Sequence, residues 1–475
     1  MMLKLPTLRD EYKVASALCV LTIIAIYLRF KNLTFQSLWN DELASAFLSD
    51  PDRSILSVFN FTLRHNHPPL YQAWLWLWYR WFGFNEYSGR ALSAIVGSLA
   101  VPAMYFLGKE FFCKRVGVYS ALIATFNYFL VFYSQETRSY ILLFLFTCLS
   151  WYYCMKCIHD RTAGRPVMYC LTTILLLYTH YYGFLVFTAQ IVCALRYAFS
   201  TNRILMKQFL PYMAIISLAA LPLFPTMSWM AAKTDFWLEQ PDPWFIVDYF
   251  HDYFDSDFLS ILFGLILLLG LKFKGDGFVK KYRTEMQCNA IWLFIVYFLP
   301  YLRGFISLPM LHVRYTIVCL PAIIMLLALS INEIESRFRR NALVVLVLIG
   351  SAVALFYPAS YYTTINKEQH RQAIETLLDR RKHQPVYSCN SKWVNTYLKM
   401  LGSSLRTQSH ELIMPVLEEG KINGEMWIIT NSIHGCEELV TLIDKQIKKS
   451  VVTAIEKTGF LKVKLYHLSA PPPDS

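Results

Sequence analysis

The sequence has 475 residues, of which 55% are hydrophobic and only 16% are charged, and its mean hydropathy is +0.36. Soluble proteins carry about 25% charged residues, so this composition excludes an ordinary soluble protein and indicates a chain that lies mainly in lipid. The net charge of +12 would suit a nucleic-acid-binding protein only if the basic residues shared one water-exposed face. They lie instead between apolar runs, as in membrane proteins, and we expect no nucleic-acid partner.

Apolar runs long enough to cross a bilayer recur along the first three quarters of the chain. They predict a polytopic α-helical membrane protein whose transmembrane module covers residues 1–358. The run at 13–29 is not followed by a small-residue cleavage site, so we interpret it as a retained first helix. We expect about eleven transmembrane helices, at 13–29, 88–108, 116–133, 138–156, 166–180, 183–198, 208–231, 257–272, 288–302, 314–331 and 341–358.

Lysine and arginine gather in every second connection between these helices. The first of the connections rich in lysine and arginine is 4–13 and the last is 337–340. The connections that alternate with them are poorer in positive charge. By the positive-inside rule, the N-terminus is predicted to be cytoplasmic and the long first loop, 31–87, to lie outside. With an odd number of helices, the C-terminal region is predicted to lie outside as well.

The first outer loop carries several candidate site residues. Asp41 and Glu42 are adjacent, and a carboxylate can act as general base toward a hydroxyl nucleophile. The alternative is that both are simply solvated. His65 and His67 precede two prolines, which fix the backbone before a helix. They could ligate a metal, but no third ligand is evident from the spacing, and they could equally be incidental to the helix start.

Residues 68–84 are rich in tryptophan, which favours the membrane–water interface. We predict a helix that lies along the outer surface there and does not cross the bilayer. A spanning helix would place the basic residues of 109–115 outside, against the positive-inside rule.

The predicted spans contain no Asp, Glu, Lys or Arg near their middles, unlike most ion-coupled transporters. This favours a site at the outer interface. Cations are few in the outer connections, so Arg138 and Arg314 are candidates for binding a lipid phosphate, with Lys233 as a further charge. The alternative is that each arginine only extends toward water from a helix end. Neighbouring candidates in the same connections are Glu136, His180, Tyr181 and Tyr315.

The chain becomes soluble in character near residue 359, and 359–475 predicts a small extracytoplasmic α/β domain. Its expected strands are 385–388, 426–430 and 461–468, and its expected helices are 393–401 and 437–447. Cys389 and Cys436 could form a disulfide if this domain lies in an oxidising compartment. The sequence leaves that question open.

Together these motifs resemble the polytopic C-type glycosyltransferases (GT-C), which use polyprenyl-phosphate sugars. The similarity is to the branch of the dolichyl-phosphate-mannose–protein mannosyltransferases and the lipid A aminoarabinose transferases. The motifs that carry it, in chain order, lie at 38–42, 67–71, 90, 133–140, 179–181, 314–315 and 367–371.

The resemblance implies an inverting glycosyltransferase that moves a sugar from a polyprenyl-phosphate donor to an acceptor hydroxyl at the outer face of the membrane. Asp41 would be the catalytic base, with Glu42 beside it. The donor phosphate would be held by Arg138, Arg314, His180, Lys233 and Tyr315, and the acceptor side would be shaped by His65, His67, Glu136 and Tyr181. We expect no required cofactor, and leave open whether a divalent metal, seen near this site in some relatives, takes part.

The expected partners are the donor lipid, the membrane and a glycan, lipid or protein acceptor. The part of the chain after about residue 375 resembles no known segment, and because acceptor recognition could lie there, the acceptor is left open. A bacterial inner-membrane enzyme that modifies O-antigen or another envelope glycan is favoured. The alternative is a flippase or transporter of lipid-linked sugars, against which the uncharged span centres argue.

Overall fold

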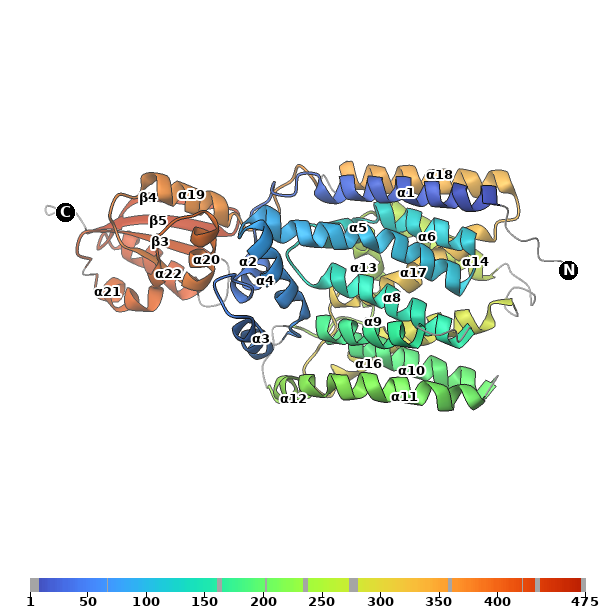
Figure 1. Ribbon diagram of the computed structural model, residues 1–475. Helices are drawn as coiled ribbons and strands as arrows, with labels where there is room; N and C mark the ends of the chain where they lie inside the picture. The colour runs from blue at the N-terminus through green and yellow to red at the C-terminus, as the bar shows by residue number, and fades with distance from the viewer. Residues whose placement is uncertain are drawn as a thin grey trace. The chain divides into compact units, whose positions relative to one another are not determined.

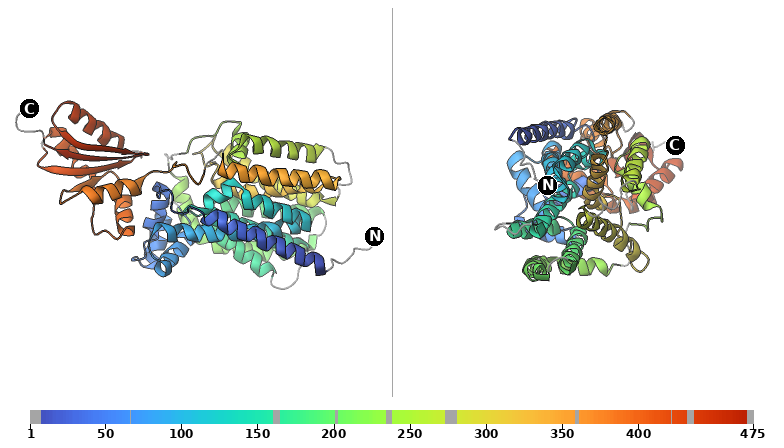
Figure 2. Two further views of the ribbon diagram at one scale, coloured as in Figure 1. Left: turned by 90° about the horizontal axis from the view of Figure 1, so that it is seen from above. Right: turned by 90° about the vertical axis from the view of Figure 1, so that its right-hand side faces the viewer.

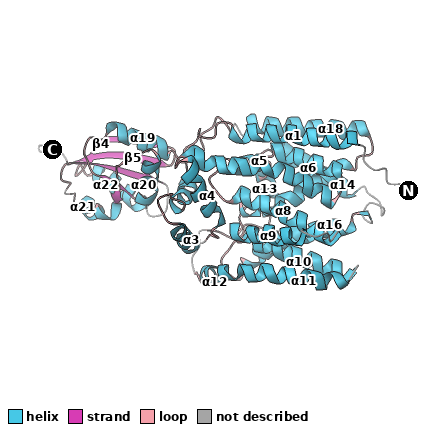
Figure 3. Ribbon diagram, viewed as in Figure 1, coloured by secondary structure: helices cyan, strands magenta, loops and turns pink. Residues whose placement is uncertain are grey.

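The computed structural model describes residues 8–65, 67–159, 165–200, 203–233, 238–272, 281–357, 361–420, 422–431 and 436–470. It divides into two compact units. The first comprises Met1–Lys31, Ile55–Trp74 and Arg90–Tyr362. The second comprises Asn32–Ser54, Leu75–Gly89 and Thr363–Ser475. In the described part of the chain, every strand belongs to the second unit, as the magenta arrows of Figure 3 show.

The first unit is built from helices, labelled in Figure 1. Two of them, α4 and α5, also contribute residues to the second unit. In chain order they are α1 (Leu8–Phe30), α3 (Ile55–Arg64), α4 (Leu70–Phe82), α5 (Glu86–Phe111), α6 (Lys114–Phe126), α7 (Tyr128–Ser134), α8 (Tyr140–His159), α9 (Arg165–Thr179), α10 (Tyr182–Ser200), α11 (Arg203–Ala220), η1 (Leu221–Leu223), α12 (Phe224–Ala231), α13 (Phe245–Asp252), α14 (Asp257–Lys272), α16 (Arg283–Arg303), η2 (Tyr315–Cys319), α17 (Leu320–Asn332) and α18 (Arg337–Phe356).

Among the described residues, seven helices are long and apolar enough to cross a membrane, or up to nine if each of two bent pairs is one span. The expected runs at 166–180 and 288–302 form α9 and α16, which are not among these candidates; α9 has only 15 residues. The polytopic helical class is therefore confirmed, whereas the count of about eleven spans is not. The surface helix expected at 68–84 corresponds to α4.

The helices of the first unit pack as a bundle, which Figure 2 (right) shows nearly end-on. Helix α8 packs against α9, α10 against α16, and α6 against α17. Polar side chains join three of them: Gln190 of α10 donates to the Ser150 hydroxyl of α8 at 2.7 Å, and that hydroxyl shares a 2.8 Å hydrogen bond with Thr173 of α9. Such bonds satisfy buried polar groups where water is absent.

The second unit contains a five-stranded sheet with the order β2-β1-β3-β5-β4. The pairs β2–β1 and β1–β3 are parallel, and the pairs β3–β5 and β5–β4 are antiparallel. The strands are β1 (Val386–Ser388), β2 (Gln408–Ser409), β3 (Glu425–Asn431), β4 (Thr453–Phe460) and β5 (Val463–Ser469). The helices are α2 (Asn40–Leu48), α19 (His370–Arg380), α20 (Ser391–Met400), α21 (Met414–Glu419) and α22 (Cys436–Lys448), with η3 at His410–Leu412.

The predicted α/β character of the C-terminal region is confirmed, because all three expected strands and both expected helices have counterparts in β1, β3, β5, α20 and α22. Strand β4 was not expected. It lies at the edge of the sheet and none of its residues is fully buried, so charged residues such as Glu456 and Lys457 occur within it.

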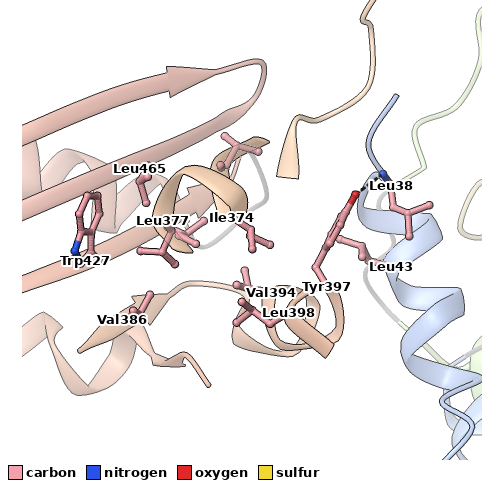
Figure 4. Packing of buried hydrophobic residues seen from close by; sticks show 13 residues of the cluster. Leu38, Leu43, Ile374, Leu377, Val386, Val394, Tyr397, Leu398, Trp427 and Leu465 are labelled. Carbon is pink, nitrogen blue, oxygen red and sulfur yellow. Dashed lines mark hydrogen bonds between the residues drawn. The ribbon is translucent and has the colours of Figure 1, made fainter. Parts of the chain in front are cut away.

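The core of the second unit includes residues from the first outer loop. Leu38 and Leu43 are completely buried and belong to one cluster with Ile374, Leu377 and Val394 of the C-terminal region. Figure 4 shows the Leu38 backbone N–H donating to the Tyr397 hydroxyl, at 3.2 Å, and Leu43 of α2 beside Tyr397. The segment that carries the acidic pair is therefore fixed by the packing of this unit.

A disulfide joins Cys389, just after β1, to Cys436 at the start of α22, with Cα atoms 5.6 Å apart. The bridge that the sequence left open is thus formed in the structure.

Candidate functional site

The acidic pair lies at the start of a helix. The sequence interpretation placed Asp41 and Glu42 on an interfacial loop, and this was wrong: both are in the first turn of α2. A helix of nine residues is too short to show a clear apolar period, which is why the sequence did not indicate it. Carboxylates at this position are stabilised by the positive end of the helix dipole.

The two acids have different surroundings. Glu42 is completely buried, and its carboxylate forms an ion pair with the buried Lys367 Nζ at 3.4 Å. Asp41 is half-buried. A buried ion pair holds its partners in place, since removal of either leaves an uncompensated charge. Of the two carboxylates, Asp41 is therefore the more accessible to a second molecule.

In the first unit, two arginines from different connections approach one group of aromatic rings. The Arg138 guanidinium donates to the Tyr140 hydroxyl at 3.4 Å, and the Arg314 Cζ lies 6.0 Å from the centre of the Tyr315 ring. The rings of Tyr140 and Tyr315 are 6.2 Å apart, and the His180 ring lies 4.9 Å from that of Tyr315. We call Arg138, Arg314, His180, Tyr140 and Tyr315, together with His67, the arginine cluster.

His67 is assigned to this cluster because, besides burial, the charges of both arginines lower the pKa of its imidazole. Loss of water around the ring, followed by the charges of Arg138, His65 and Arg314, lowers the pKa of His67 to about 3. Burial, followed by His67 and the same two arginines, lowers the pKa of His180 to about 3. Both imidazoles are therefore neutral at pH 7, and the positive charge of the cluster comes from Arg138 and Arg314.

The helix ends add to this positive potential. Tyr140, Tyr182 and Tyr315 are each the first residue of a helix; Arg314 lies one residue before such a start, and Arg138 and His180 lie two residues before one. The N-terminal end of a helix carries a partial positive charge and unpaired N–H groups, so several such ends together favour an anion. The tight α9–α10 connection needs glycine at Gly183, where a Cβ would lie 2.8 Å from the Leu176 carbonyl oxygen.

Tyr181 and Lys233 lie at a groove in the same unit. The Tyr181 hydroxyl lies near the Thr226 side chain, and the Lys233 Nζ lies 4.3 Å from the centre of the Trp229 ring. Thr226 and Trp229 line an open cavity of about 330 Å³ together with Leu63, Arg64 and Pro225. This groove is largely apolar with cations at its margin, a combination that suits a lipid phosphate.

The remaining candidates are placed individually. Glu136 is completely buried in the turn before Arg138. Burial is the main reason why the pKa of Tyr361 is raised, and the Glu136 carboxylate raises it further, so these two groups are close. His65 is exposed and directly follows α3, a short helix that the sequence did not predict. Among the described residues, no group of three or more His, Cys, Asp and Glu side chains is arranged to hold a metal ion.

The structure thus brings together His67, Arg138, His180, Arg314 and Tyr315, and it places Lys233 with Tyr181 at the groove. The sequence indicates Lys367 only as part of the motif at 367–371. It does not indicate that Lys367 is the partner of Glu42. The two residues are 325 positions apart, so no local pattern could reveal the pair.

The lowered pKa values of the two histidines predict an acid-dependent loss of stability. Because the folded protein keeps His180 neutral down to about pH 3 while the unfolded chain protonates it near pH 6.5, the free energy of unfolding falls as the pH drops through this window. At pH 5 this residue alone would contribute a loss of about 2 kcal/mol. We expect the melting temperature of the purified protein to fall from pH 7.5 to pH 5, and to fall less in His180→Gln. Equal falls in both proteins would contradict this assignment.

Residues 66–229 match the family model described as dolichyl-phosphate-mannose-protein mannosyltransferase. Among proteins with curated descriptions, none matches the sequence significantly.

Solved structures match nearly the whole chain at low sequence identity. ArnT from Cupriavidus metallidurans in the apo state is 11% identical, with a TM-score of 0.66 over 95% of this chain and 98% of that one. The same protein bound to undecaprenyl phosphate gives a TM-score of 0.60 at 11% identity, over 94% of this chain and 97% of that one. The archaeal oligosaccharyltransferase AglB from Archaeoglobus fulgidus, in complex with an inhibitory peptide and a dolichol-phosphate, gives 0.54 at 12% identity, over 90% of this chain and 70% of that one.

At such identities the matches show a shared fold. They confirm the expected GT-C fold class and the resemblance that the ordered motifs indicated. The expectation of a glycosyltransferase is confirmed at the level of the family model.

Proposed function

We propose that this chain, which has the fold of the polytopic C-type glycosyltransferases, transfers a sugar from a polyprenyl-phosphate donor to an acceptor hydroxyl. The observation that carries the proposal is the arginine cluster. Two guanidinium groups, two neutral imidazoles and the N-terminal ends of several helices gather there, which favours a phosphate group over a cation.

The donor lipid has a place beside this cluster. The apolar groove between α3 and α12 suits an isoprenoid chain, and Lys233 at its margin adds a positive charge. Tyr181, adjacent to His180, lies near the groove residue Thr226 and so links the two features. Arg138 and Arg314 therefore bind the phosphate, with His180 and Tyr315 completing its surroundings.

In the reaction, the Asp41 carboxylate accepts the proton of the acceptor hydroxyl. The acceptor oxygen then forms a bond with the anomeric carbon while the bond from that carbon to the phosphate oxygen breaks, so the configuration inverts and polyprenyl phosphate leaves. Negative charge grows on the departing phosphate, and the two arginines stabilise it. Glu42 keeps the first turn of α2 in place through Lys367, and His65, His67 and Glu136 shape the acceptor side.

The site acts at the outer face of the membrane, and the acceptor is an envelope glycan, lipid or protein. The proposed location is a bacterial inner membrane. Two observations support this orientation. Basic residues alternate between connections as the positive-inside rule requires. A disulfide in the second unit is typical of an oxidising compartment.

Reconstitution tests the proposal against a flippase. Proteoliposomes that contain the protein and a polyprenyl-phosphate sugar should release polyprenyl phosphate when an acceptor glycan is added, and mass spectrometry of both products should show the transferred sugar. Cells without the protein should lack that sugar on their envelope glycans. Movement of the intact donor between leaflets, without cleavage, would instead establish a flippase and overturn the proposal.

A further inference from the structure

A chain of hydrogen bonds in the second unit ends on Asn40, the residue before Asp41. The Asn40 backbone N–H donates to one oxygen of Glu368 at 3.1 Å, and the Asn40 side-chain amide donates to the other at 2.6 Å. The Glu368 carboxylate also lies 3.0 Å from His370 Nε2. Glu368 thereby satisfies an N–H group at the start of α2 that has no partner within the helix.

A second residue holds Asn40 from strand β3. Asn431, the last residue of β3, donates its side-chain amide to Asn40 Oδ1 at 3.1 Å. The orientation of the Asn40 amide is therefore determined at both ends: its nitrogen faces Glu368 and its oxygen faces Asn431. A flip of this amide would lose both hydrogen bonds.

Asn431 lies against the disulfide. Its Oδ1 is 3.0 Å from the sulfur of Cys436 and 3.7 Å from that of Cys389. The bridge ties the start of α22 to the end of β1, the strand next to β3 in the sheet. Asn431 and Cys436 also line an open cavity of about 440 Å³, through which a small thiol can approach.

We propose that Asn431 and Glu368 are positioning residues for Asp41, and that the Cys389–Cys436 disulfide completes this arrangement. The inference rests on the proposed function, because it concerns the same carboxylate. With both cysteines reduced, the start of α22 is no longer tied to the end of β1, so Cys436 can move away from Asn431 and the first turn of α2 loosens. The enzyme is therefore fully active only after its C-terminal region has been oxidised.

Hydrogen exchange on the full-length protein in nanodiscs tests this proposal. Asn431→Asp keeps the shape of the side chain but removes the donor and faces Asn40 Oδ1 with a carboxylate. We expect the amides of residues 38–44 to exchange about tenfold faster in this variant, as befits the loss of one buried hydrogen bond. Treatment of the wild-type protein with a phosphine reductant should have the same effect.

Two controls separate positioning from general destabilisation. Asn395→Asp is the matched substitution, since Asn395 accepts from the Thr407 N–H at 2.7 Å in the same unit. It should leave the exchange of residues 38–44 within twofold. The double variant Cys389→Ser and Cys436→Ser should exchange as the reduced protein does and should not respond to reductant.

Function gives an independent readout. In Asn431→Asp, sugar transfer should fall at least tenfold while the dissociation constant for undecaprenyl phosphate stays within twofold. Unchanged exchange at 38–44 in both Asn431→Asp and the reduced protein would overturn the inference, as would an equal response in Asn395→Asp. If the exchange pattern is as expected but the oxidised wild-type protein transfers no sugar, the positioning network stands and the proposed function fails.

Discussion

Replacing Asp41 with Asn should lower sugar transfer at least a hundredfold while leaving the fold intact. The amide cannot accept a proton at neutral pH, and general-base catalysis typically contributes about 10²- to 10⁴-fold to the rate. Because Asp41 is half-buried and Asn has nearly the same shape, little change in packing is expected. The measurement is mass spectrometry of envelope glycans, with turnover of the donor lipid followed in isolated membranes.

The matched control is Asp52→Asn. Asp52 is exposed, belongs to the same outer loop and pairs with Lys399. Its replacement should leave transfer within about twofold, since exposed ion pairs contribute little. Wild-type transfer by Asp41→Asn, at a normal amount of protein in the membrane, would show that another group is the base.

Replacing Arg138 or Arg314 with Ala should weaken donor binding about 10- to 100-fold each. A charge-assisted hydrogen bond contributes roughly 1.5–3 kcal/mol, which corresponds to this range. The neutral histidines cannot supply the missing charge at pH 7, since their pKa values are about 3. Native mass spectrometry or a thermal-shift titration with undecaprenyl phosphate provides the measurement.

The decisive feature of this second prediction is that donor binding should weaken more than acceptor binding. Lysine at either position should restore only part of the affinity, because it lacks the planar fork of arginine. Arg196→Ala serves as the control: this exposed arginine donates to Gln287 at 3.3 Å and is expected to have no effect. If both cluster variants weakened acceptor binding as much as donor binding, phosphate recognition would be the wrong explanation.

The sequence indicated the arginine cluster because each of its members stands next to a long apolar run. Arg138, His180 and Arg314 lie one or two residues before the start of a helix. Long apolar runs are the strongest pattern in a membrane protein. Their convergence could not be derived from spacing, since the three connections are far apart in the chain. The ordered resemblance to a known family supplied that expectation.

Other features have no sequence pattern that could reveal them. Helices α2 and α3 have nine and ten residues, too few for a periodicity to stand out from an irregular loop. The Glu42–Lys367 pair and the Asn40–Asn431 hydrogen bond join residues 325 and 391 positions apart. Such pairs depend on tertiary structure alone.

The hydrophobic core of the second unit also determines when the acidic segment can reach its final packing during synthesis of the protein. Leu38 and Leu43 precede most of the membrane helices in the sequence, yet they pack in one cluster with Leu465, which follows those helices. During translation, the acidic segment must therefore wait, without its final packing, until the helices between it and the C-terminal region, and strand β5 itself, have been made. A chain that lacks β5 would therefore lack part of the core against which the segment of Asp41 packs.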